Sequence, residues 1–150
     1  MTARLSPEDR RELADLVLRY ATAVDNRDWD LLETCFAADA TALYGRLELG
    51  DREAIVEHLR TAVAEVDAIQ HFVTNQQVKV EGDEVTSDSY LYAYHGWRAE
   101  PPRDFYIRGG YHDRMTRTPE GWRIAYRHRL EATWGRGDRS HLGGRAAHSN

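Results

Sequence analysis

Four polar residues of this sequence carry side chains suited to acid–base chemistry: Tyr20, Asp25, His71 and Arg127. A neutral imidazole is the natural base near neutral pH, and a carboxylate on its second ring nitrogen orients it and stabilises the imidazolium that forms. A tyrosine hydroxyl or a guanidinium stabilises negative charge on a substrate, and a hydroxyl can protonate a leaving group. If the fold brings the four together, they predict an elimination or isomerisation without a cofactor, with His71 as the base.

An amphipathic helix must position the first two of these residues. Residues 6–9, Ser-Pro-Glu-Asp, are typical of a helix start, and apolar residues then recur at helical spacing as far as residue 25 or 26. Five residues of helix advance about 7.5 Å and rotate by about 140°, so Tyr20 and Asp25 do not point the same way. We therefore expect both to border one cavity only if it lies beside the last turn.

The remaining elements form an α+β pattern. We expect a second helix at 29–36, short strands at 41–44 and 46–49, a third helix from 50–51, and long strands at 69–80, 85–97, 105–117 and 122–133. His71 falls in the first long strand and Arg127 in the last. Helices followed by an antiparallel meander predict a curved sheet over three helices, with a cone-shaped cavity between them. We assign residues 1–134 to this domain and expect residues 135–150 to be a mobile tail.

Aromatic and histidine side chains are the candidates for contacting a substrate. Within 85–97, Tyr90, Tyr92 and Tyr94 share one face of the strand, whereas His95 belongs to the other. The candidate substrate-binding residues are Tyr44, Tyr92, Tyr94, His95, Trp97, Phe105 and His112. Packing in the core or in a dimer interface accounts for the aromatic ones equally well.

Composition argues against several classes of protein. A net charge of −5 argues against nucleic-acid binding, which needs a basic face. The single cysteine, Cys35, excludes an internal disulfide, and the seven histidines are never spaced His-x-His or His-x-x-x-His, so we expect no metal. No apolar run approaches the roughly 18 residues of a membrane span and no secretory signal is visible, so we expect a cytoplasmic protein without a membrane partner.

Several segments resemble the SnoaL-like family of the nuclear-transport-factor-2-like superfamily. They are residues 20–30 (YATAVDNRDWD), 35–40 (CFAADA), 70–75 (QHFVTN), 110–114 (GYHDR) and 121–124 (GWRI). The resemblance spans residues 6–134 and implies a cone-shaped α+β barrel, with a strongly curved antiparallel or mixed sheet wrapped over three N-terminal helices.

The branch with the nearest resemblance contains scytalone dehydratase, bile-acid dehydratase and hexachlorocyclohexane dehydrochlorinase. There an Asp near the end of the first helix pairs with a His on the first long strand, and Asp25 and His71 match these positions. Arg127 matches an Arg of the dehydrochlorinase, Tyr20 matches a Tyr of the bile-acid enzyme, and His95 lies one position from a second His of scytalone dehydratase. The resemblance implies a lyase or isomerase acting on a mostly apolar, ring-containing small molecule. It also implies a homo-oligomer, dimer or trimer, formed through the sheet.

Two other functions fit the same residues. The superfamily also contains polyketide cyclases, which can use the same acid and imidazole, and non-catalytic modules that bind small molecules or oligomerise. A sheltered cavity with Asp25 against His71 favours an enzyme. A filled cone, or a carboxylate facing bulk water, favours a binding module.

Overall fold

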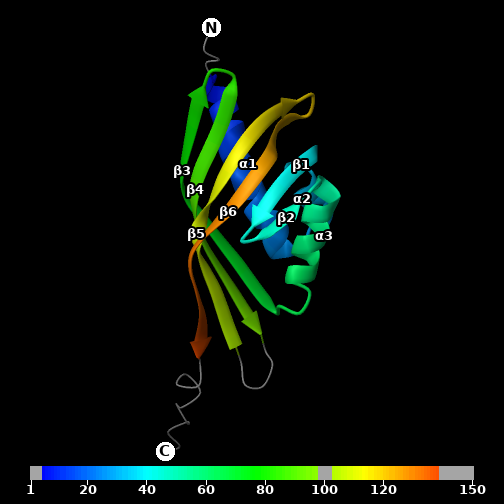
Figure 1. The fold of residues 1–150 in the computed structure, drawn as a ribbon, viewed down its shortest axis with the longest axis vertical. Helices are drawn as coiled ribbons and strands as arrows, with labels where there is room; N and C mark the ends of the chain where they lie inside the picture. Colours follow the sequence, from blue (N-terminus) through cyan, green and yellow to red (C-terminus); the bar gives the residue numbers. More distant parts are fainter. Residues whose placement is uncertain (1–4, 98–102, 139–150) are drawn as a thin grey trace, which may run out of the picture.

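In the computed structural model, which describes residues 5–97 and 103–138, three helices pack against a six-stranded curved sheet (Figure 1). In chain order the elements are α1 (Pro7–Asn26), α2 (Trp29–Glu33), β1 (Phe36–Tyr44), β2 (Leu47–Leu49), α3 (Arg52–Ala62), β3 (Ala68–Glu81), β4 (Glu84–Trp97), β5 (Arg103–Thr118) and β6 (Gly121–Asp138). The predicted α+β fold, with a mixed sheet over N-terminal helices, is confirmed. The sheet curves but does not close.

The strand order places the first strand of the chain beside the last one. The order across the sheet is β2-β1-β6-β5-β4-β3, and β3 to β6 form the expected antiparallel meander. The first strand, β1, pairs in parallel with β6, so that Tyr44 lies opposite Arg129. A residue from the N-terminal third of the chain therefore neighbours the last strand.

Helix α1 begins and ends at positions that its sequence specifies. The Ser6 hydroxyl accepts a hydrogen bond from the backbone N–H of Asp9 at 3.0 Å, and the Asp9 carboxylate accepts one from the backbone N–H of Ser6 at 3.0 Å. The helix stops at Arg27, whose left-handed backbone (φ 55°) allows its N–H to donate to the carbonyl of Val24. Asp25 therefore lies in the final turn, beside the sheet.

Three predicted boundaries are wrong, because strand pairing overrides local propensity. The second helix ends at Glu33 rather than at residue 36, and β1 begins at Phe36 rather than at residue 41, where Phe36 pairs with Ile124 of β6. The last strand, β6, extends to Asp138 rather than ending at residue 133, since Gly135 and Gly137 pair with β5. Residues 139–150 lie outside the described residues.

A β-bulge in β3 changes which residues of that strand face the helices. Asn75 has a positive φ of 55°, and the pairing with β4 shifts between Thr74 and residue 77. Odd-numbered residues such as His71 are the more buried ones before the bulge, and even-numbered residues such as Gln76 are so after it. The Gln76 amide donates to the carbonyl of Leu13 at 3.0 Å, so both halves of β3 contact α1.

Within the described residues, no helix is long and apolar enough to cross a membrane.

Candidate active site

Asp25 and His71 are in direct contact. An Asp25 carboxylate oxygen, Oδ1, lies 2.7 Å from Nδ1 of the His71 ring, and the backbone N–H of His71 donates to both carboxylate oxygens, at 3.0 and 3.1 Å. The side chains are only 24 % and 7 % exposed, respectively. Because Nδ1 faces the carboxylate, Nε2 is the ring nitrogen directed away from it. This is the arrangement of an oriented general base.

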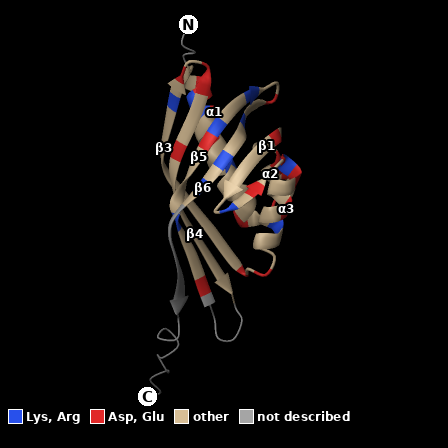
Figure 2. Cartoon of the chain, in the orientation of Figure 1, with Lys and Arg blue, Asp and Glu red and all other residues tan. Residues whose placement is uncertain are grey.

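The carboxylate must come from α1, because the neighbouring sheet supplies none. Residues 68–74 of β3 and 90–97 of β4, which carry His71 and His95, contain no Asp, Glu, Lys or Arg (Figure 2). Asp25 at the end of α1 therefore places a single negative charge against an otherwise uncharged stretch of sheet. Because both side chains are largely shielded from water, the interaction between the carboxylate and the imidazole is stronger than it would be on the surface.

His71 lines a small hollow between α1, α3 and the inner face of the sheet. The polar side chains around it are Tyr20, Tyr44, His58, His71, His95, Tyr111 and Arg129. Its free volume is only about 40 Å³, enough for about one water molecule. The sheltered Asp25–His71 pair is what we expected of an enzyme, whereas the nearly filled cone is what we expected of a binding module.

Tyr20 and Tyr44 form a hydroxyl pair at the edge of this hollow. Their oxygens are 3.2 Å apart, and both residues are buried. The Tyr20 ring meets the His71 ring edge-on, with 6.4 Å between centroids. Burial, and to a lesser degree the Tyr20 hydroxyl, raise the pKa of Tyr44 well above its ordinary value, so its hydroxyl stays protonated. One hydroxyl of the pair donates to the other, so the pair can donate one hydrogen bond into the hollow.

His95 is a second imidazole in the hollow. Its ring lies 5.9 Å from the His71 ring, edge to face, and its Nδ1 has no hydrogen-bond partner among the described residues. Burial, followed by the positive charge of a protonated His71, lowers the pKa of His95 to about 4. Trp97 and Phe105 pack against the His95 ring, at 6.5 and 5.8 Å between centroids, without lining the hollow themselves.

The structure places three of the predicted substrate contacts on the opposite face of the sheet. Tyr92 is 39 % exposed, and the Tyr94 hydroxyl donates to Asp104 at 3.1 Å. The ring nitrogen Nδ1 of His112 lies 2.7 Å from the carboxylate of Asp88, again on the outer face. Side chains alternate along a strand, so the inward orientation of His95 excludes its even-numbered neighbours from the hollow.

Arg127 lies in the core, apart from the hollow. It is fully buried, and its Nε and Nη2 donate to the two carboxylate oxygens of Asp113, each at 2.7 Å. Its guanidinium stacks on the rings of Tyr111 and Tyr20, 3.8 and 4.1 Å from their centroids. The Arg127 guanidinium therefore packs against the ring of Tyr20 and holds it in place, and Arg127 does not line the hollow.

Three polar residues that line the hollow were missed in the sequence: Arg129, His58 and Tyr111. Arg129 lies two positions after Arg127, hence on the same strand face, and its guanidinium is 4.9 Å from the ring centroid of Tyr44. The ring of His58, on α3, is 5.4 Å from that of Tyr44. The signal for His58 was its place on the apolar stripe of α3, between Ile55 and Leu59.

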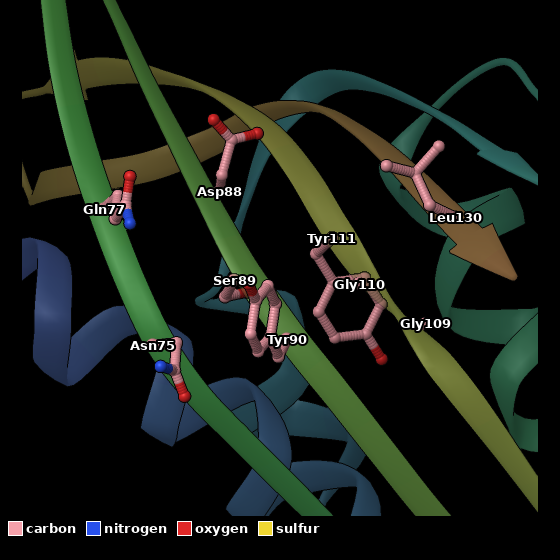
Figure 3. A pocket seen from close by; sticks show the side chains of 9 residues that line it. All are labelled: Asn75, Gln77, Asp88, Ser89, Tyr90, Gly109, Gly110, Tyr111 and Leu130. Atoms are coloured by element: carbon pink, nitrogen blue, oxygen red, sulfur yellow. The ribbon is translucent and has the colours of Figure 1, made fainter. Parts of the chain in front are cut away.

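A wider hollow lies on the outer face of the sheet, and residues of β3, β4, β5 and β6 line it (Figure 3). Its volume is about 480 Å³, and its lining includes Tyr90, Gly109, Gly110, Leu130 and Asp88. It holds no imidazole, and the Asp88 carboxylate is already bound by Lys79 and His112. Among the residues whose side chains the structure describes, no three His, Cys, Asp or Glu side chains converge as a metal site requires. The smaller, inner hollow is therefore the candidate active site.

Known proteins resemble this chain in sequence and in fold. The profile of the SnoaL-like domain family matches residues 6–128. An uncharacterized protein of Mycobacterium tuberculosis is 29 % identical over 122 residues, which cover 79 % of this chain and 82 % of that protein.

Two solved structures show the same fold at lower sequence identity. A hexachlorocyclohexane dehydrochlorinase of Novosphingobium barchaimii has a TM-score of 0.76 at 18 % identity, covering 88 % of this chain and 94 % of its own. A candidate scytalone dehydratase of Novosphingobium aromaticivorans has a TM-score of 0.77 at 19 % identity, covering 85 % and 86 %. These similarities establish the fold.

Proposed function

This chain belongs to the SnoaL-like family, and on that premise we propose that it is a lyase or isomerase acting on a small, mostly apolar, ring-containing molecule. The observation that carries the proposal is the 2.7 Å contact between Asp25 and the sheltered His71 ring. The names of the two similar structures, a dehydrochlorinase and a candidate dehydratase, describe eliminations and support the same reaction class.

His71 acts as the general base in this proposal. Its Nε2 removes a proton from a carbon beside a carbonyl group or opposite a leaving group, and Asp25 stabilises the imidazolium through Nδ1. A positioned base of this kind contributes about 10²–10⁴-fold to the rate. His95, whose pKa of about 4 keeps it neutral near pH 7, adds no competing positive charge beside the imidazolium.

The tyrosine pair handles the charge that forms on the substrate. In a dehydration the C–H bond breaks, its electrons form the new double bond, and the C–O bond breaks. The departing hydroxide takes a proton from Tyr20 or from the His71 imidazolium and leaves as water. In an isomerisation, the hydroxyl of the pair that does not donate to the other instead donates to the enolate oxygen, and the His71 imidazolium returns the proton to another carbon of the enolate. One donor of this kind contributes about 10²–10³-fold.

The small free volume sets a condition on this proposal. Sites for small molecules usually enclose about 300–1,000 Å³, far above the 40 Å³ present here. We expect a substrate to displace the side chains of Trp97 and Phe105, which pack against the His95 ring at a tilt. The same observation favours a second candidate function, a non-catalytic module that oligomerises through its sheet.

A matched pair of variants tests the proposal. A panel of cyclic hydroxy-ketones is incubated with the wild type, His71→Ala and His112→Ala, and loss of substrate is followed by mass spectrometry. His112 makes the same 2.7 Å contact with a carboxylate, but on the exposed face. We expect His71→Ala to lower kcat/KM by about 100-fold or more and His112→Ala to change it less than about twofold. Unchanged turnover by His71→Ala removes the assignment, and binding without turnover by the wild type favours the binding module.

We also propose that the outer sheet face joins copies of this chain. Phe72, Tyr90, Tyr92 and Leu130 are large apolar side chains that are 39–65 % exposed there. Sedimentation velocity of the wild type and Tyr92→Glu tests this, and a monomeric wild type would exclude it.

A further inference from the structure

Three tyrosines line the inner hollow, and their side chains form one hydrogen-bonded network with Tyr20 in the middle. The Tyr20 hydroxyl, on α1, lies 3.2 Å from the Tyr44 hydroxyl, on β1. Tyr111, on β5, is a further hydrogen-bonding partner of the Tyr20 side chain. The rings of Tyr20 and Tyr111 meet edge to face, with 5.5 Å between centroids. Three elements that are distant in the sequence therefore bring phenol groups together beside His71.

A buried cation lies against two of these rings. The guanidinium carbon of Arg127 is 4.1 Å from the ring centroid of Tyr20 and 3.8 Å from that of Tyr111, and Arg127 is fully buried. Its Nε and Nη2 donate to Asp113, whereas its Nη1 has no hydrogen-bond partner among the described residues. Because the surroundings exclude water, this cation stabilises negative charge on a neighbouring phenol more than it would on the surface.

The network places its negative charge on Tyr20. Burial is the main reason that the pKa values of Tyr44 and Tyr111 lie well above their ordinary value, and a negative charge on Tyr20 and a hydrogen bond to it add to both rises. The Arg127 charge acts on both in the opposite direction. Tyr44 and Tyr111 therefore keep their protons and donate to the Tyr20 oxygen, so the Tyr20 proton is the one that the network can give away.

Tyr20 is also in contact with the proposed base, since its ring meets the His71 ring edge-on at 6.4 Å between centroids. We propose that Tyr111 and Arg127 are positioning residues that act through Tyr20 and make its hydroxyl the proton donor of the site. The role of Tyr20 as donor to a substrate rests on the proposed function. The network itself is a property of the free protein and does not.

The proton transfers of a dehydration balance through these groups. As the C–O bond of the substrate breaks, the departing hydroxide takes the Tyr20 proton and becomes water. Hydrogen bonds from Tyr44 and Tyr111 and the charge of the guanidinium stabilise the phenolate that remains. The His71 imidazolium, which holds the proton taken from carbon, then returns it to the Tyr20 oxygen by way of the water product. Both residues thereby regain their starting forms.

Ionisation of the tyrosines in the free protein tests the network without a substrate. The wild type is labelled with ¹³C at the tyrosine Cζ atoms, the signals are assigned with Tyr→Phe variants, and the protein is titrated from pH 7 upward by NMR. We expect Tyr20 to ionise at a lower pH than Tyr44 and Tyr111. The proposal is overturned if Tyr44 or Tyr111 ionises first, or if Tyr20 stays protonated until the chain unfolds.

Tyr111→Phe keeps the ring against Arg127 and removes only the hydroxyl. We expect the midpoint of the Tyr20 titration to rise by about one pH unit, because one hydrogen bond to the phenolate is lost. On a hydroxy-ketone that the wild type converts, kcat is expected to fall about tenfold and KM to change less than about twofold. Tyr126→Phe is the matched control, since its ring lies 5.6 Å from the Arg114 guanidinium carbon but does not line the hollow. It is expected to change neither quantity.

A double variant, Arg127→Met with Asp113→Leu, tests the cation without leaving Asp113 unpaired. We expect it to raise the midpoint of the Tyr20 titration by about one pH unit or more, because the phenolate loses a neighbouring positive charge. An unchanged midpoint in the folded double variant overturns the role of Arg127. If the double variant does not fold, the order of ionisation in the wild type still decides the proposal.

This inference and the proposed function fail in different ways. If the titrations follow these expectations but the wild type converts no hydroxy-ketone, the proposed function fails and the tyrosine network stands. If His71→Ala abolishes turnover while a folded Tyr111→Phe leaves kcat and the Tyr20 midpoint unchanged, the proposed function stands and the role of Tyr111 fails.

Discussion

Two aspartate–histidine pairs with the same contact lie on opposite faces of the sheet. In both, an aspartate Oδ1 lies 2.7 Å from a histidine Nδ1. The inner pair, Asp25 and His71, is 24 % and 7 % exposed, whereas the outer pair, Asp88 and His112, is 40 % and 44 % exposed. The contact distance therefore does not distinguish a candidate catalytic pair from a surface pair. Exclusion of water and the neighbouring donors do, because they strengthen the electrostatic interaction.

A third pair shows the opposite extreme. Asp113 and Arg127 are both completely buried, with two 2.7 Å hydrogen bonds between them. A guanidinium stays protonated at all ordinary pH values and this one reaches no hollow, so the pair cannot exchange protons with a substrate. Of the three pairs, only Asp25–His71 joins a titratable base to a sheltered space.

The largest expected effect separates the two aspartate–histidine pairs. Asp25→Asn removes the charge that stabilises the imidazolium and permits the wrong ring tautomer, so we expect kcat to fall by about 10²–10⁴-fold. Asp88→Asn is expected to change kcat less than about twofold. Steady-state kinetics on any hydroxy-ketone that the wild type converts measures both, and equal losses in the two variants would contradict the comparison.

The next largest effect concerns the stability that the buried Asp113–Arg127 pair contributes. Arg127→Ala leaves Asp113 as a buried, unpaired charge, and we expect it to lower the free energy of unfolding by about 3–5 kcal/mol. Urea denaturation followed by circular dichroism measures this. The double variant Arg127→Met with Asp113→Leu should recover most of the loss, since it removes both charges. If the single variant lowers the free energy of unfolding by less than about 1 kcal/mol, as loss of an exposed ion pair does, the comparison is contradicted.

The smallest effect concerns the exposed Asp88–His112 pair and the stability of the fold at acidic pH. The hydrogen bond with His112 is the main reason that the pKa of Asp88 lies below its ordinary value of 3.8. A carboxyl group with a lower pKa in the folded state stabilises the fold above its unfolded pKa and loses that contribution as the pH falls below it. Because Asp88 is exposed, we expect less than about 1 kcal/mol. Urea midpoints of the wild type and Asp88→Asn between pH 6 and pH 3 check this, with a shallower acid dependence expected in the variant.

Local features of the fold were readable from the sequence, and features set by distant pairing were not. The capping residues at Ser6 and Asp9 predicted the start of α1, and strand alternation separated His95 from Tyr92. The parallel pairing of β1 with β6 and the bulge at Asn75 depend on contacts between segments far apart in the chain. Helix propensity alone extended the second helix through Phe36, which pairs instead with β6.

The residues of the candidate site likewise differ in whether the sequence could reveal them. Asp25 and His71 were found through family resemblance, which carries information about distant pairing. Arg127 was also chosen through the resemblance, but Arg129 lies on the same strand face, and only the register of β5 against β6 shows that Asp113 stands opposite Arg127. Tyr92 and Tyr94 cannot share the hollow with His95, since adjacent residues of a strand point to opposite faces.

The tautomer of His71 tests the central claim most directly. If Asp25 orients this ring as a base, the neutral imidazole carries its proton on Nδ1, toward the carboxylate, and leaves the lone pair of Nε2 free. Long-range ¹H–¹⁵N correlation spectra of the wild type, assigned with His71→Ala, report which nitrogen is protonated. The account predicts the Nδ1–H form for His71. A proton on Nε2 in the neutral ring would leave no free base facing the hollow and would contradict it.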